Sequence, residues 1–454
     1  MLAGIRPDPA APGFKKIILK PAIVGDLTWV NCHHDCQYGR IVSNWKREGD
    51  QVTLAVTIPP NTTATVYVPA QDAAKVTEGG KPASTATGVK FLRLEAGCAL
   101  FEVGSGSYLF ASTLPPPAPS RFVPAAPVVY PDGRPGASWR LDAIDQGVVL
   151  KHGDGPGQCD LLGAREALIF EEKGVYHLFY DGAGPKGWLA CLATSQDLKT
   201  WTKKGPVLEF GKPGEMDAAA ACSPWVHFDG NDWHMFYLGT PHTSPAPDLI
   251  PAFPYLTLKA KSKSLGGPWI KQPEVVPFRT QPGTYYSATA SPGHIIKQGE
   301  EYWQFFSAST SQPCLRTLGI ARTKNLEGAW TVDAKPIVPA AEQVENTSLY
   351  FEPANRTWFL FTNHIGLEGD EYTDAIWVYW SQDLNRWNAA DKAVVLDGRN
   401  CRWSRKCIGM PSVVKVGNRL AIFYDAPGGD SKSHMRRDLG LAWLNLPLTP
   451  PAIH

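Results

Sequence analysis

The chain lacks an excess of charge of either sign. Its 454 residues carry 44 Lys and Arg against 43 Asp and Glu, a formal net charge of +1, and the basic residues form no cluster. Nucleic acid and anionic membrane surfaces are therefore not expected partners. No apolar run reaches 18 residues, so we expect no membrane-spanning helix.

The sequence also predicts neither a signal peptide in its opening stretch nor a disulfide framework. The opening stretch MLAGIRPDPAAPGFKK has no apolar core region, so no signal peptide is expected in it, and the compartment stays open. The nine cysteines are odd in number and widely spread, which favours buried free thiols, with Cys401 and Cys407 as a potential exception. The run CHHDC, Cys32 to Cys36, would alternate between two faces of a strand, so we expect neither a metal site nor a cofactor.

What the chain does contain is typical of an all-β protein. Aromatic residues, Gly and Pro are abundant, and many short β-branched runs are bounded by turn residues. Residues 1–112 show short alternating runs and predict a small antiparallel β-sandwich. Residues 113–138 are so rich in proline that regular strands are not expected, and they predict an extended linker or a strap.

The first segment resembles the C-terminal β-sandwich domain of family 78 α-L-rhamnosidases. The resemblance is carried by AGIRPDPAAPGFKKIILKP, LTWVNC, YGRIVSNW, IPPNTTATVYVP and VGSGSYLF. In that family the domain is an accessory to a helical catalytic barrel that has no counterpart here. The resemblance therefore implies descent from a carbohydrate-active gene and a packing or sugar-binding module, but no rhamnosidase activity.

Residues 139–454 hold five copies of one pattern. Each copy has a leading loop, a first strand, an aromatic second strand and a further strand, and several end in S-x-D-L-x-x-W. The second strands are seen in VYHLFYDG, DWHMFYLG, EYWQFFSA, TWFLFTN and RLAIFYDA. Five copies of about sixty residues predict a five-bladed β-propeller. The repeated aromatics are expected to pack between neighbouring blades.

Function in a propeller is expected where the first strands of all blades converge around one axis. Carboxylates precede or open three of these strands: Asp160 and Glu166 in the first repeat, Asp217 in the second, and Glu345 in the fourth. The alternative is that Asp160 and Asp217 cap turns, as Asx residues often do.

The second segment resembles the five-bladed propeller glycosidases, the superfamily of families 32, 43, 62, 68 and 117 and the β-mannoside phosphorylases. In REALIFEEKGVYHLFYDG, Glu166 falls where the arabinofuranosidase, xylosidase and invertase families carry a catalytic aspartate. In VENTSLYFEPANRTWFLF, Glu345 falls at the position of the invertase-type general acid. The chain departs from the pattern where Glu166 replaces Asp and where Ser291 stands in place of a further acid.

A glycosidase needs one protonated carboxyl group and one ionised carboxylate on either side of the scissile bond. We predict Glu345 as the acid, Glu166 or Asp160 as the base, and Asp217 as a third acid. Candidates for sugar binding are Arg165, Trp188, Trp225, His242, Tyr286, His364, Trp403, Arg405, His434 and Arg436.

The sequence thus favours a glycoside hydrolase that removes terminal sugars from plant or algal polysaccharide fragments with inversion. An oligosaccharide or polysaccharide is the expected partner, and the oligomeric state is left open. Two alternatives remain: a catalytically silent glycan-binding propeller, which the missing third acid would explain, and a phosphorylase or transferase on the same scaffold.

Overall fold

The computed structural model describes residues 2–24, 27–114, 118–367 and 371–451. The chain divides into two compact units, Met1–Pro117 and Ala118–His454. The boundary lies inside the predicted linker, most of which belongs to the second unit. Regular structure is almost entirely β-strand, as expected. Within the described ranges, no helix is both long and apolar enough to cross a membrane.

The first unit is a sandwich of two sheets around one apolar core. One sheet has the order β1-β2-β7-β11-β10, and the other has the order β3-β5-β6-β12-β8-β9, with β4 paired to β5. The strands are β1 (Ile5–Pro7), β2 (Lys16–Leu19), β3 (Trp29–Val30), β4 (His33–Cys36), β5 (Gly39–Glu48), β6 (Gln51–Ile58), β7 (Thr63–Pro69), β8 (Thr77–Glu78), β9 (Lys81–Pro82), β10 (Val89–Glu95), β11 (Cys98–Val103) and β12 (Gly106–Thr113). Alternate residues of β6 point into the core, as the sequence period requires. One pair, β2 with β7, is parallel, so the sheet is not purely antiparallel.

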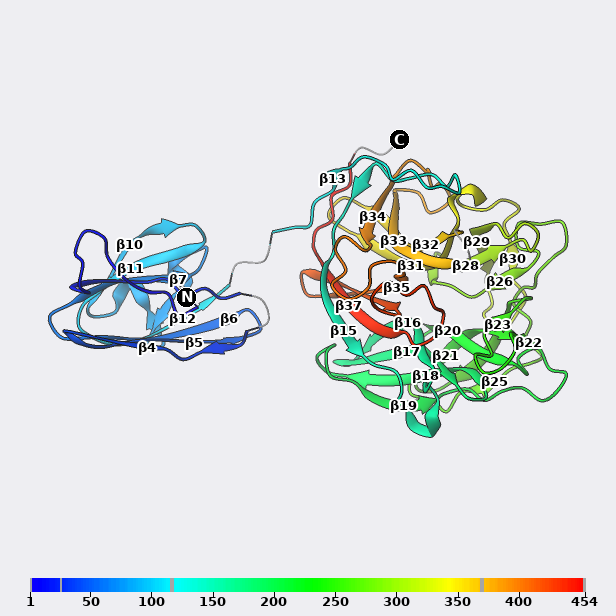
Figure 1. Ribbon diagram of the computed structural model, residues 1–454, viewed down its shortest axis with the longest axis horizontal. Coiled ribbons are helices and arrows are strands. Elements are labelled where there is room, and N and C mark those ends of the chain that lie inside the picture. The colour runs from blue at the N-terminus through cyan, green and yellow to red at the C-terminus, as the bar shows by residue number, and fades with distance from the viewer. Residues whose placement is uncertain (1, 25–26, 115–117, 368–370, 452–454) are drawn as a thin grey trace. The chain divides into compact units, whose positions relative to one another are not determined.

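The second unit is a β-propeller in which each of the five repeats forms a group of neighbouring antiparallel strands, called a blade below (Figure 1). The first two blades join into one eight-stranded sheet through the parallel pair of β18 and β20. Blade one comprises β16 (Gly163–Glu172), β17 (Val175–Gly184), β18 (Gly187–Ser195) and β19 (Thr202–Pro206). Blade two comprises β20 (Ala220–Phe228), β21 (Trp233–Thr240), β24 (Leu256–Ser262) and β25 (Ile270–Lys271), with a side hairpin of β22 (His242–Thr243) and β23 (Pro251–Ala252).

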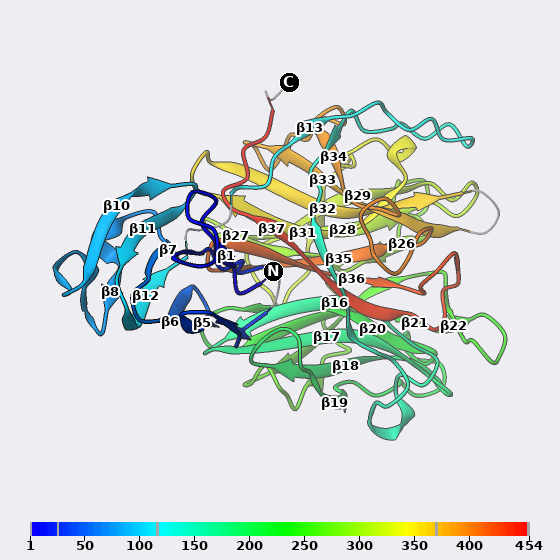
Figure 2. The ribbon, with the colours of Figure 1, turned by 60° about the vertical axis from the view of Figure 1, so that its left-hand side comes forward.

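The remaining blades repeat this order. Blade three comprises β26 (Thr289–Ser291), β27 (Ile295–Gln298), β28 (Glu301–Ser309), β29 (Arg316–Thr323) and β30 (Thr331–Val332). Blade four comprises β31 (Val344–Glu352), β32 (Thr357–Gly366), β33 (Tyr372–Ser381) and β34 (Lys392–Leu396). Blade five comprises β35 (Gly409–Val416), β36 (Arg419–Ala426) and β37 (Asp438–Asn445), joined by β15 (Ile144–Leu150) from the start of the unit. Figure 2 shows β16 to β19 and β31 to β34 as successive strands of two blades.

The described residues also include four single-turn 3₁₀ helices, η1 (Ala73–Lys75), η2 (Ala83–Thr85), η3 (Pro156–Gln158) and η4 (Ala340–Glu342). The helices η3 and η4 lie in leading loops of blades one and four.

The proline-rich stretch is a strap on blade four. Its two-residue strand β13 (Val123–Pro124) pairs with β14 (Trp139–Arg140), which pairs with β34, so the expectation of no strand in this stretch is wrong at these positions. Arg134 of the strap is buried and forms ion pairs with Asp132 at 2.8 Å and with Asp374 at 3.0 Å. The pair with Asp374, a residue of β33, holds the strap to blade four, whereas Asp132 belongs to the strap itself.

The predicted aromatic packing between blades is observed. Phe179 of blade one meets Trp269 of blade two edge-on at 6.2 Å between ring centroids, and Phe305 of blade three meets Trp387 of blade four at 6.5 Å. These Trp residues end the repeat motif after the third strand, and their rings fill the space against the preceding blade.

Candidate active site

The first strand of nearly every blade is broken by a β-bulge near its start. The pairing register shifts between Arg165 and Leu168, Cys222 and Trp225, Glu345 and Ser348, and Gly409 and Ser412. At each shift one residue has a positive φ: Glu166 (50°), Ser223 (46°), Asn346 (58°) and Met410 (59°). Left-handed conformations are unfavourable for residues with a side chain and gather at functional sites, as bulges do.

These bulge residues share one cavity. It has a volume of about 200 Å³ and is lined by Glu166, Ser223, Asn346 and Met410 together with Ser291, which holds the same place in blade three. Every blade therefore contributes the same position of its first strand. The bulge is what turns these side chains toward the axis.

Glu166 is half-buried in the cavity wall. Its backbone N–H donates to Asp425 Oδ2 at 3.0 Å instead of joining the ladder with β17. Its side-chain Oε2 accepts a hydrogen bond from the Asn346 amide at 3.4 Å. Blades four and five thus both contact the acid of blade one.

Glu345 faces the same cavity from blade four. Arg316 Nη1 lies 2.5 Å from its Oε2, and the Asn363 amide lies 3.4 Å from its Oε1. Burial raises the pKa of Glu345 above its usual range, the Arg316 charge opposes this effect, and the charges of Glu371 and Glu166 add to it. The carboxyl group can therefore hold a proton at a pH where an exposed glutamate would be ionised.

Arg316 connects Glu345 to a second cavity carboxylate, Glu371. Arg316 Nε and Nη2 lie 2.5 and 2.7 Å from the two oxygens of Glu371, which is the bidentate arrangement. Burial would raise the pKa of Glu371, but the hydrogen bond and charge of Arg316 outweigh it and the pKa is lowered. Glu371 is therefore the ionised member of this group.

Arg165, Trp188 and His434 form another part of the wall. Arg165 Nη1 donates to His434 Nδ1 at 3.0 Å, and His434 Nε2 donates to the Glu371 carbonyl at 3.0 Å. Burial and the charges of Arg165 and Arg437 lower the pKa of His434 to about 4. Since Arg165 can only donate, the His434 ring is neutral with its proton on Nε2.

Asp181 is a fully buried carboxylate at the cavity wall. It accepts the Ser223 backbone N–H at 2.5 Å and the Ser223 hydroxyl at 2.8 Å. Burial and the charge of Glu166 raise the pKa of Asp181 well above its usual range.

Asp160 and Asp217, predicted as pocket acids, do not line this cavity. Asp160 is fully buried against Lys203 Nζ at 2.5 Å and the Tyr180 hydroxyl at 3.2 Å. Asp217 contacts Lys271 Nζ at 2.5 Å and the Tyr237 hydroxyl at 2.8 Å. Both side chains are tied to the outer strand of their own blade, which turns them away from the axis.

The same arrangement recurs in blade four. Glu342 Oε2 lies 2.5 Å from Lys392 Nζ and 2.5 Å from the Tyr379 hydroxyl. An acid of the leading loop, a lysine of the fourth strand and a tyrosine thus form one repeated buried triad. The acid that recurs in the sequence, Asp160, Asp217 or Glu342, therefore binds the leading loop to the fourth strand of its own blade.

Of the predicted sugar-binding residues, Arg165, Trp188 and His434 line the cavity, and the other seven lie elsewhere. Three of these seven are packed inside blades. Trp225 packs in the core between blades one and two, and the Tyr286 hydroxyl donates to Gln281 at 2.8 Å. His364 is buried with its ring stacked on Trp377 at 3.9 Å. These three rings therefore serve packing, and Trp225 and His364 lie on strands β20 and β32.

The remaining four do not line the cavity either. Trp403 Nε1 donates to the Tyr424 hydroxyl at 2.7 Å, and Arg405 forms an exposed ion pair with Asp430 at 2.6 Å. His242 is exposed on the side hairpin, and Arg436 is exposed next to the cavity residue His434. Arg436 uses its backbone N–H to bind the Leu162 carbonyl at 2.6 Å.

Sequence reasoning missed three charged residues of the wall: Asp181, Arg316 and Glu371. Asp181 could have been found from the sequence, because it is the acid of the FYDG motif in the first repeat. Arg316 begins β29, and Glu371 directly precedes β33, positions with no repeated motif. Their roles follow from contacts between blades.

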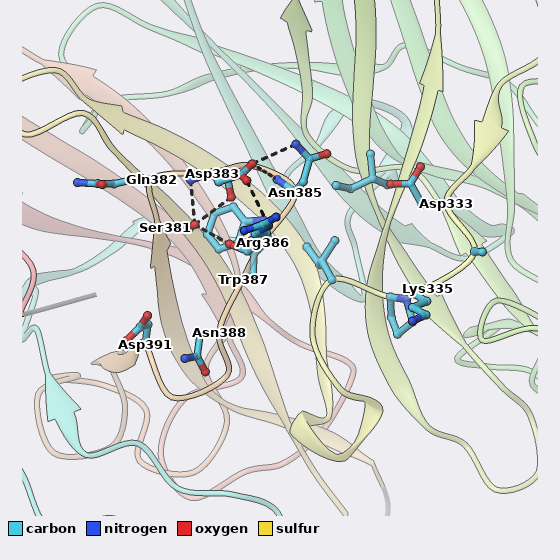
Figure 3. A pocket seen from close by; sticks show the side chains of 14 residues that line it. Asp333, Lys335, Ser381, Gln382, Asp383, Asn385, Arg386, Trp387, Asn388 and Asp391 are labelled. Carbon is cyan, nitrogen blue, oxygen red and sulfur yellow. Dashed lines mark hydrogen bonds and ion pairs between the residues drawn. The ribbon is translucent and has the colours of Figure 1, made fainter. Parts of the chain in front are cut away.

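A larger groove, of about 800 Å³, lies between the outer parts of blades three and four (Figure 3). Its residues include Asp383, whose Oδ1 accepts a hydrogen bond from the Asn385 backbone N–H at 2.9 Å. They also include Trp387, whose Nε1 donates to the Leu384 carbonyl at 2.9 Å. A matching groove of about 730 Å³ between blades one and two is lined by Trp269 of the same motif. The groove is therefore a consequence of the repeat.

Residues 4–83 match the family model of the bacterial α-L-rhamnosidase C-terminal domain. An α-L-rhamnosidase of Streptomyces avermitilis is 34% identical over 109 residues, which are 24% of this chain and 10% of that protein. The match thus spans about a tenth of the length of this curated relative. It identifies the first unit as a domain similar to that of rhamnosidases and leaves the propeller unmatched.

Two solved structures resemble the chain over more than two thirds of its length. One, described as a BT0996 RGII complex, is 14% identical with a TM-score of 0.52, covering 68% of this chain and 95% of the other. Another, described as a glycoside hydrolase, is 13% identical with a TM-score of 0.50, covering 69% and 95%. Since the first unit holds only residues 1–117, these likenesses lie mainly in the second unit and show its fold.

Proposed function

We propose that the second unit is a five-bladed propeller glycoside hydrolase domain that removes terminal sugars from plant or algal polysaccharide fragments. The observation that carries the proposal is that Glu166 and Glu345, from blades one and four, line one cavity at the axis. Glycoside hydrolysis uses two such carboxyl groups on opposite sides of the bond. The family model, by contrast, matches only the first unit, so the activity rests on this site.

In this proposal Glu345 is the general acid. Its pKa is raised by burial, so the protonated form that the leaving oxygen needs is available. Glu166 is the general base that activates water, and the Asn346 amide at 3.4 Å orients its Oε2. The neutral His434, which hydrogen-bonds Arg165, presents a polar but uncharged surface to sugar hydroxyls.

The size of the cavity supports action on a terminal sugar. Its volume of about 200 Å³ is below the roughly 300–1,000 Å³ of sites for larger ligands. One sugar ring at the axis, with the rest of the chain leading outward, is the arrangement that we propose. Inversion is proposed in line with the arabinofuranosidase-like resemblance, and proton NMR of the first sugar released distinguishes the two anomers.

The first experiment is a hydrolysis screen of the purified protein. Nitrophenyl glycosides of arabinofuranose, xylose, galactose and rhamnose are tested beside plant and algal oligosaccharides, with rhamnose-containing pectic fragments first because of the rhamnosidase-like unit. Wild-type protein is expected to release a monosaccharide, and E166Q to release none. The matched control is E172Q, the same substitution on the same strand, which is expected to behave as wild type.

A catalytically silent glycan-binding propeller is the second candidate. The observation in its favour is that Ser291, at the cavity, stands where an acid is expected, while Glu345 is already paired with Arg316. Oligosaccharide binding without any sugar release by the wild-type protein would establish it. Sugar release only when inorganic phosphate is added, with a sugar phosphate as product, would instead establish a phosphorylase.

A further inference from the structure

Asp425 lies behind the cavity, on the second strand of blade five. It is fully buried, and its Oδ2 accepts hydrogen bonds from the Glu166 backbone N–H at 3.0 Å and from Arg165 Nε at 3.4 Å. Its other oxygen, Oδ1, accepts Arg437 Nη1 at 2.5 Å. The carboxylate therefore binds the main chain of blade one at the bulge that carries Glu166.

The same position in other blades makes the same contact with the next blade. Asp181 of blade one accepts the N–H of the bulge residue Ser223 in blade two at 2.5 Å. Ser307 of blade three accepts the N–H of the bulge residue Asn346 in blade four at 2.9 Å. A polar acceptor on the second strand thus recurs as the partner of the left-handed residue in the following blade.

This contact answers a specific need of the bulge. A residue with a side chain persists in a left-handed conformation only when its surroundings hold it there. The bulge also removes the N–H of residue 166 from the ladder, and a buried N–H without a partner is unfavourable. A carboxylate acceptor makes a stronger, charge-assisted hydrogen bond than a neutral group would.

Asp425 is itself held in place. Arg437 is fully buried, and besides Asp425 it contacts Cys407 Sγ at 2.8 Å and the Ser433 carbonyl at 3.0 Å. These contacts fix the orientation of the guanidinium group and, through it, of both Asp425 oxygens. The acceptor for the bulge is thus rigid.

We propose that Asp425 is a positioning residue that aims the Glu166 carboxylate at the substrate by holding its left-handed backbone. The catalytic part of this inference rests on the proposed role of Glu166 as general base. Because Asp425 belongs to the last blade and Glu166 to the first, the base acquires its orientation only when the ring of blades is closed.

The test compares D425N with D145N. Asp145 is also a buried aspartate of blade five, but it accepts the Tyr424 hydroxyl at 2.6 Å and lies away from the cavity. We expect D425N to lower kcat per folded molecule by about 100-fold, the loss associated with a small misplacement of a reacting group, with little change in KM. Hydrogen exchange of the Glu166 amide should become faster in D425N. We expect D145N to retain both kcat and the slow exchange.

If D425N does not fold, D425N/R437Q replaces it, because this double variant removes the buried charge that D425N leaves without its partner. A folded variant that keeps the kcat of D145N, or in which the Glu166 amide stays protected, overturns the proposal. The exchange measurement needs no turnover. A wild-type protein without hydrolase activity would therefore refute the proposed function, while the exchange of the Glu166 amide would still decide whether Asp425 holds the bulge.

Discussion

Two groups of carboxylates in the second unit have opposite surroundings. In the leading loops, Asp160 and Asp217 each meet a lysine and a tyrosine of their own blade. In the cavity, Glu166 and Glu345 meet residues of other blades, such as Asn346 and Arg316. The first group was prominent in the sequence because it repeats. The second group is where the proposed chemistry lies.

The difference shows that, in this repeat protein, the residues that stabilise the fold recur from blade to blade, whereas the residues of the candidate site vary. The leading loops of blades one, two and four are held by the same acid–lysine–tyrosine group, so this acid recurs in the sequence. The cavity takes a different group from each blade, and the corresponding position of the first strand accordingly holds Glu166, Ser223, Ser291, Asn346 and Met410 in blades one to five. In this propeller a position shared in place but varied in residue type marks the candidate site.

Of the tests that sharpen this comparison, E345Q is expected to give the largest effect. If Glu345 is the general acid, the substitution removes its proton and should lower kcat by about 100-fold to 10,000-fold while sugar binding is retained. Steady-state hydrolysis and calorimetric binding to the same oligosaccharide measure the two quantities. Retention of more than a tenth of wild-type kcat would contradict the assignment and would place the acid elsewhere in the cavity.

D160N tests the other side of the comparison. Removing the carboxylate leaves the Lys203 ammonium with only the exposed Asp154 carboxylate and the Lys151 carbonyl as partners, which should lower the free energy of unfolding by about 1.5–3 kcal/mol. Denaturant unfolding measures this loss, and kcat per folded molecule should not change. The loss should be smaller in D217N, because the Lys271 side chain is 26% exposed whereas that of Lys203 is 10% exposed. A D160N protein of wild-type stability that lacks turnover would instead make Asp160 catalytic.

A smaller effect is expected on the pH dependence of kcat. The acid Glu345 must be protonated, so activity should fall as pH rises through its pKa, which burial places above the usual glutamate range. The Arg316 charge lowers this pKa, so R316Q should raise it and move the alkaline limb of the profile to higher pH. A limb that moves to lower pH, or does not move, would show that Glu345 does not set it.

The smallest effect is expected from R405A. Arg405 was predicted to bind sugar, but its side chain is 64% exposed in an ion pair with the 55% exposed Asp430. Water screens such a pair, so neither the melting temperature nor KM should change measurably. An increase of KM of tenfold or more would extend the binding surface beyond the cavity to this loop.

The all-β fold and the extent of the repeats were predictable from local patterns. Strand periodicity, turn residues and aromatic motifs are short-range signals, and five copies reinforced them. The placement of Glu166 and Glu345 in one cavity was predictable from the alignment of their repeats. Their partners were not, because Arg316 and Glu371 are part of no repeated motif and lie 55 residues apart.

The sequence by itself determined that the chain forms a small sandwich and a propeller of repeated sheets, since alternation and turn chemistry are written into each segment. The tertiary structure alone decided which carboxylates serve the fold and which face the cavity. Asp160 and Glu166 are six residues apart, yet Lys203 draws one toward the outer strand and Asp425 turns the other toward the axis. Burial and ion pairing depend on residues that come into contact only when the ring of blades is closed. These contacts cannot be predicted from the local sequence.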